Sequence, residues 1–149
     1  MRSQKEIDDL LMSLSKTKFR GSFHLNNNMK KYCLDKGLEK IKKDAYELIT
    51  KRIAPAYPKN DGKQTPMRAN SHPIFIAQHA CGCCCRNCLK RIHHISKGQE
   101  LTQTQIDYII QVLMTWIKKE LQNNWYLFDF KSFQLYNNIL LNVSIGKWL

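Results

Sequence analysis

Five of the six cysteines lie within residues 81–88, and this cluster constrains the chain more than any other feature. Disulfide bonds between such close neighbours would be strained, and only Cys33 is placed to join a distant part of the chain. Cys85-x-x-Cys88 is a spacing at which two thiolates meet one tetrahedral ion across a turn. Cys84 competes with Cys85 for the role of metal ligand, because the side chains of adjacent residues point in different directions. We therefore expect a metal site in a reducing compartment, the cytoplasm.

The histidines around this cluster leave the full ligand set open. His93 would face the same ion if its helix ended or bent there. His79 or His72 would supply the fourth ligand from the strand that precedes the cysteines. Thiolate-rich sites favour zinc, with an iron–sulfur cluster as the second choice. The alternative is a group of buried cysteines that pack without any metal.

Apolar residues recur at helical spacing in several stretches, so we expect a mainly α-helical fold. Capping boxes mark two helix starts, at Ser3 with Glu6 and at Thr102 with Gln105. The apolar run at residues 73–77 is interpreted as a short buried strand or an extended segment, which would make the fold a small α+β one. The expected helices span about residues 4–14, 28–53, 85–92 and 106–121.

Composition divides the chain into three parts. Residues 1–18 form an N-terminal helix, and residues 19–121 form a single domain whose helices pack around the Cys/His segment. Residues 122–149 form an extension that is rich in aromatic side chains. We expect this extension to pack over the helices as two short strands, with an exposed interaction surface as the alternative.

Three motifs follow one another along the chain: residues 58–68 (PKNDGKQTPMR), residues 72–79 (HPIFIAQH), and a cysteine motif (CCRNCL) at residues 84–89 with a histidine at 93. Together they resemble the bacterial domain-of-unknown-function family numbered 4186, over about residues 19–121. That family has no assigned activity, so the resemblance implies domain limits but no function. Its pattern has other residues at positions 81 and 83, and the ligand set it favours is His79, Cys84, Cys85, Cys88 and His93.

The chain is strongly basic, with a formal net charge of +12. Between Lys16 and Lys97, 18 basic residues stand against 5 acidic ones, so this part alone carries +13. A field this concentrated favours a polyanion such as nucleic acid, and an acidic protein surface is the alternative partner. A merely solubilising surface is the third interpretation. The predicted phosphate contacts are Lys59, Lys63, Arg68, Arg86, Lys90 and Arg91, with Arg68 and Arg86 the strongest candidates.

Two other functions stay open. The first is a metal-dependent hydrolase or nuclease, because the Asp-Gly-Lys at residues 61–63 matches half of a nuclease motif in which Asp44 or Glu47 would be the second acid. The second is a protein-binding inhibitor or adaptor, such as an anti-defence protein of a phage or mobile element. No run of 18 apolar residues is present, so we expect no membrane span. The sequence identifies no catalytic residue and no oligomeric state.

Overall fold

The computed structural model describes residues 1–68 and 71–122, and over these residues it consists of helices and loops without strands. The prediction of a mainly α-helical fold is confirmed. The aromatic extension lies almost wholly outside the described residues. The elements are α1 (Gln4–Ser15), the short 3-10 helix η1 (Arg20–Ser22), α2 (Asn27–Lys36), α3 (Leu38–Arg52), α4 (Pro73–Cys81), α5 (Arg86–His93) and α6 (Gln103–Gln122).

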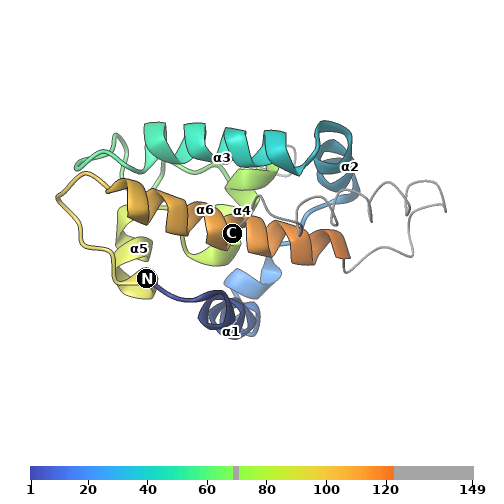
Figure 1. Ribbon diagram of the computed structural model, residues 1–149, viewed down its shortest axis with the longest axis horizontal. Coiled ribbons are helices and arrows are strands. Elements are labelled where there is room, and N and C mark those ends of the chain that lie inside the picture. The colour runs from blue at the N-terminus through green and yellow to red at the C-terminus, as the bar shows by residue number, and fades with distance from the viewer. Residues whose placement is uncertain (69–70, 123–149) are drawn as a thin grey trace.

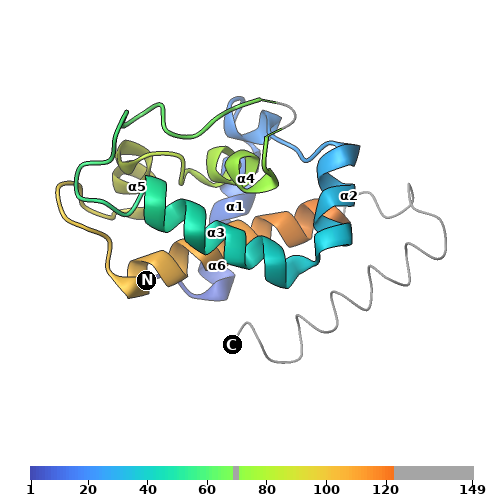
Figure 2. The same ribbon diagram turned by 90° about the horizontal axis from the view of Figure 1, so that it is seen from above.

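The long helix α6 runs through the middle of the molecule, between α3 and α1 (Figures 1 and 2). It also packs along α4, which is buried over its whole length. The apolar face of α6 is almost fully buried, as are Ile7 of α1 and Ile41 of α3, so these helices share one core. No helix in residues 1–68 and 71–122 combines the length and the apolar character that a membrane crossing needs.

Both predicted capping boxes are present. The Ser3 hydroxyl accepts from the Glu6 amide, and the Glu6 carboxylate accepts from the Ser3 amide. At the start of α6, the Gln105 amide donates to Thr102 Oγ1 at 3.1 Å and the Thr102 amide donates to Gln105 Oε1 at 2.9 Å. These reciprocal bonds satisfy amides that a helix start would otherwise leave unpaired.

Two predicted elements are corrected by the structure. The segment 28–53 is not one helix, because Gly37 adopts a φ of 86° and separates α2 from α3. The run at residues 73–77 is helical and not extended. Pro73 occupies the first helical position of α4, where its missing amide costs nothing, and His72 caps that helix by accepting from the Ile74 amide. A helix buried on every side reads as a continuous apolar run, just as a buried strand does.

Candidate metal centre

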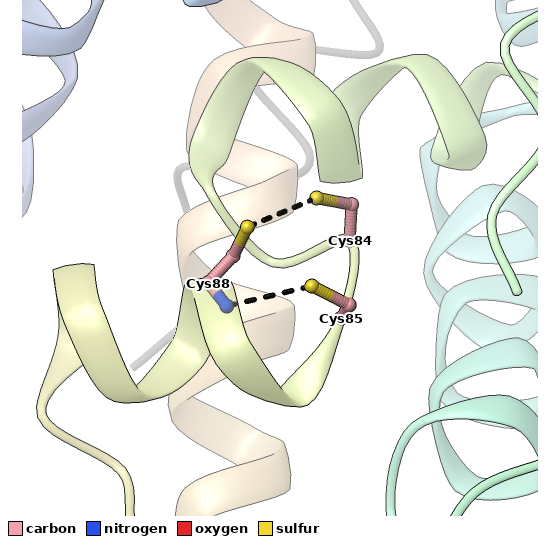
Figure 3. Close-up of side chains that lie close together, drawn as sticks. All are labelled: Cys84, Cys85 and Cys88. Carbon is pink, nitrogen blue, oxygen red and sulfur yellow. Dashed lines mark hydrogen bonds between the residues drawn. The ribbon is translucent and has the colours of Figure 1, made fainter. Parts of the chain in front are cut away.

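Cys84 and Cys85 lie on the turn that joins α4 to α5, and Cys88 lies in the first turn of α5; together these three residues form the thiol cluster (Figure 3). Gly82 ends α4 with a left-handed φ of 71°, and the next amide, of Cys83, donates back to the Gln78 carbonyl at 2.8 Å. Cys85 then caps α5, and its sulfur accepts from the Cys88 amide at 3.4 Å. The turn and the first turn of α5 thus direct the side chains of Cys84, Cys85 and Cys88 toward one another.

The distances in this cluster suit a bound metal ion. The sulfur atoms of Cys84, Cys85 and Cys88 all lie within 4.8 Å of one another, and those of Cys84 and Cys88 are 3.5 Å apart. Sulfurs that share one tetrahedral zinc at about 2.3 Å each would be about 3.8 Å apart. Cys84 and Cys85 are buried and Cys88 is half-buried. The three sulfurs could therefore hold a metal ion that is largely shielded from water.

A buried arginine, Arg20, reaches the same cluster from η1. Its guanidinium donates to Cys88 Sγ at 3.1 Å and to Cys84 Sγ at 3.6 Å, and a third bond of 2.6 Å to the His79 carbonyl fixes its position. Arg91 approaches Cys88 Sγ from the solvent side at 3.9 Å. Three thiolates around a divalent ion leave one net negative charge, which these guanidinium groups are placed to balance.

The cluster favours one thiolate even without a metal. A hydrogen bond with the Cys88 thiol, helped by Arg20 and opposed by burial, lowers the pKa of Cys84 to about 7. The same hydrogen bond, together with burial, raises the pKa of Cys88 to about 12. Cys84 therefore ionises first, and the Cys88 thiol then donates to its sulfur.

His79 lies on α4 beside the cluster but outside the three-sulfur group. Its Nε2 bonds to the Thr65 carbonyl at 3.0 Å, and its ring stacks on Phe23 with centroids 5.2 Å apart. Its Nδ1 is buried and has no hydrogen-bond partner in the described part of the chain. A buried nitrogen without a hydrogen-bond partner lowers the stability of the fold, and a bound metal ion would give this nitrogen a partner. His79 is therefore a candidate ligand.

The structure does not bring His93 to the cluster. Its Nε2 bonds to the Cys81 carbonyl at 2.8 Å and its Nδ1 to the Tyr108 hydroxyl at 2.9 Å, so both nitrogens face the core. Burial lowers the pKa of His93 to about 4. His72, the other candidate, caps α4 and pairs with Asp44 at 2.9 Å. The remaining cysteines, Cys33, Cys81 and Cys83, are fully buried packing residues whose pKa values burial raises.

Arg86 does not fit the predicted role of a phosphate contact, because its side chain is buried and only 1% exposed. Its guanidinium donates to carbonyls of two loops, at 2.7 Å to Pro55, 2.9 Å to Ser96 and 2.7 Å to Gln99. Longer bonds reach the carbonyls of residues 53 and 54. The side chain joins the loop after α3 to the loop before α6 and is a structural element of the fold.

The other predicted phosphate contacts are on the surface. Arg68 lies on the loop before α4, and Lys90 and Arg91 lie on α5; all three are exposed. Lys59 and Lys63 line a groove of about 640 Å³ between the end of α3 and the loop that follows it. Lys51 and Arg52 line the same groove from α3, and none of its described lining residues is acidic.

Comparison with known families gives one match. The family described as Domain of unknown function (DUF4186) matches residues 8–118 of the chain. The chain belongs to this family. The match begins inside α1, earlier than the predicted limit at residue 19, and it includes the whole thiol cluster. No solved structure matches the chain.

Several residues of this DUF4186 chain belong to the candidate sites although the sequence did not single them out. Arg20 ends a basic stretch at residues 16–20, and no local pattern marks an arginine whose hydrogen-bond partners lie about 60 residues away. Lys51 and Arg52, in the last turn of α3, were not among the predicted phosphate contacts. Tyr57 beside the groove is 84% exposed, and although Lys59 and Lys63 of its loop were predicted phosphate contacts, nothing in the sequence marked this ring as part of a binding surface.

Proposed function

We propose that this protein is a small basic nucleic-acid-binding protein whose fold a zinc ion stabilises. The ion is held by Cys84, Cys85 and Cys88, and the nucleic acid is bound through its phosphates by the exposed lysines and arginines. The observation that carries the proposal is the groove lined by Lys51, Arg52, Lys59 and Lys63.

The donor set supports zinc over an iron–sulfur cluster. Clusters are usually held by four thiolates, whereas the described residues group three here. A tetrahedral zinc site accepts a fourth ligand of another kind. His79 would complete the site if its ring moved toward the sulfurs, and a water molecule would complete it otherwise. Bound zinc would tie the turn at Cys84 and Cys85 to the first turn of α5 and so add to the folding free energy.

Elemental mass spectrometry of anaerobically purified protein tests the metal. We expect about one zinc per chain in the wild type and almost none in Cys88→Ala. Cys33→Ala is the matched control, because Cys33 is a buried cysteine remote from the cluster, and it should keep its zinc. A wild-type protein without metal would overturn the zinc assignment, and iron with labile sulfide would replace zinc by a cluster.

Affinity for nucleic acid, measured over a series of salt concentrations, tests the proposed nucleic-acid binding. Lys59→Gln with Lys63→Gln should weaken binding and reduce the slope of log affinity against log salt by about one per lost phosphate contact. Lys5→Gln with Lys16→Gln removes the same charge from exposed positions outside the groove and is the control. Equal losses in the two pairs would mean that net charge, and not the groove, determines binding.

A nuclease is less well supported. Asp61 Oδ1 accepts from the Arg86 amide and from the Gln64 side chain, so it caps α5 and braces its own loop. Asp44 is paired with Lys40 and His72. Within residues 1–68 and 71–122, the one group of three or more ligand residues is the thiol cluster, and Asp61 is not part of it.

A further inference from the structure

We infer that the groove after α3 binds single-stranded nucleic acid, with an unpaired base stacked on Tyr57. This inference rests on the proposed function and adds which form of nucleic acid is bound. It comes from an aromatic ring and a set of cations that the fold places along one groove.

Tyr57 is the most exposed large hydrophobic side chain in the described part of the chain, with 84% of its surface accessible. It lines the groove together with the four cations. Its hydroxyl lies near Gly98, where an added methyl group would approach it to 3.6 Å. The ring therefore extends from the loop after α3 toward the loop before α6. Its faces make no aromatic contact within residues 1–68 and 71–122.

The cations around the ring are spread along the groove. Lys51 and Arg52 come from the last turn of α3, whereas Lys59 and Lys63 come from the loop on the other side. Arg52 is held in place by a 3.0 Å bond to the Gln64 carbonyl and by the Phe75 ring, 4.9 Å from its guanidinium carbon. A guanidinium has five N–H donors, so this bond leaves others for phosphate.

The loop itself is braced. Pro55, Pro58 and Pro66 restrict its backbone, and Arg86 donates to the Pro55 carbonyl at 2.7 Å. The Gln64 side chain accepts from the Gly62 amide at 2.7 Å. A surface fixed before the ligand arrives loses less conformational entropy on binding.

This combination distinguishes a single strand from a duplex. In a duplex the base faces are stacked on one another and cannot meet a protein ring, whereas an unpaired base presents its face. Basic grooves with an aromatic platform bind single strands with little sequence preference, because every base has a π face. A duplex would contact the lysines of this groove but not the face of Tyr57.

Fluorescence anisotropy tests this with labelled oligothymidine of about 15 nucleotides, near the upper end of typical site sizes, and with a duplex of equal length. We expect the wild type to bind the single strand more tightly. Tyr57→Ala should weaken single-strand binding about tenfold, leave duplex binding unchanged and leave the salt slope unchanged. Tyr57→Phe should bind as the wild type does.

Met67→Ala is the matched control, because Met67 is an exposed apolar side chain on the same loop that does not line the groove. Its binding should equal that of the wild type. Tighter binding to the duplex, or equal binding by Tyr57→Ala and wild type, would overturn the single-strand inference and leave nucleic-acid binding standing. Absence of binding to both probes would overturn the proposed function and this inference with it.

Discussion

Replacing Arg86 by methionine should destabilise the protein by about 3 kcal/mol. The change removes three short bonds, to the carbonyls of Pro55, Ser96 and Gln99. Each partly buried carbonyl left without a donor costs about 1 kcal/mol, at the low end of the range because two of these residues have exposed side chains. The free energy of unfolding of a domain is usually about 5–15 kcal/mol, so this loss is a large fraction of it.

Urea unfolding followed by circular dichroism measures this effect. For a slope of about 2 kcal/mol per molar, the midpoint should fall by about 1.5 M. Arg86→Lys should recover less than half of the loss, because one ammonium group cannot reach carbonyls on both loops. Arg68→Met is the control, and this exposed position should change stability by less than about 0.5 kcal/mol. A loss below about 1 kcal/mol in Arg86→Met would refute the view that this side chain braces the two loops.

Two further predictions concern acid and backbone strain. Burial lowers the pKa of His93 to about 4, so folding disfavours its charged form, and its contribution is complete above the unfolded pKa of about 6.5 and is lost as the pH falls toward 4. Between pH 7 and pH 5, the loss of this contribution should lower the free energy of unfolding by about 2 kcal/mol, and in His93→Gln the free energy of unfolding should fall by that much less over the same pH range. Equal falls in the two proteins would contradict the lowered pKa of His93. Gly82→Ala should lower the free energy of unfolding, measured by denaturant unfolding, by about 1 kcal/mol more than Gly62→Ala does. Both glycines have a positive φ, but only at Gly82 would the new methyl group meet a side chain, that of Ile92 at 2.5 Å. Equal costs would show that the Ile92 side chain moves aside freely.

Several elements could be predicted because their signals are local. The capping residues and the apolar spacing of α1 and α6 specify where a helix begins and which face is buried. The same holds for the meeting of Cys85 and Cys88, because residues three apart lie on the same face of a helix start. These features need no knowledge of the rest of the chain.

The prediction for α4 failed for a physical reason. All nine residues of this helix are buried, so it lacks the polar face whose period would have marked it as helical. The break at Gly37 was missed for a related reason, since a single glycine inside a helical pattern can be tolerated or can end a helix.

The helical class, the positions of α1 and α6 and the thiol motif follow from the sequence, because each depends on residues within one or two helical turns of one another. Which charged side chains stabilise the fold depends instead on how the helices pack. Arg20 and Arg86 look like the other basic residues in the sequence, yet one is buried against sulfurs and the other against carbonyls. The same packing turned His93 toward the core and left Tyr57 exposed beside a cationic groove. Such partners lie far apart along the chain, and only the packing of the helices brings them into contact.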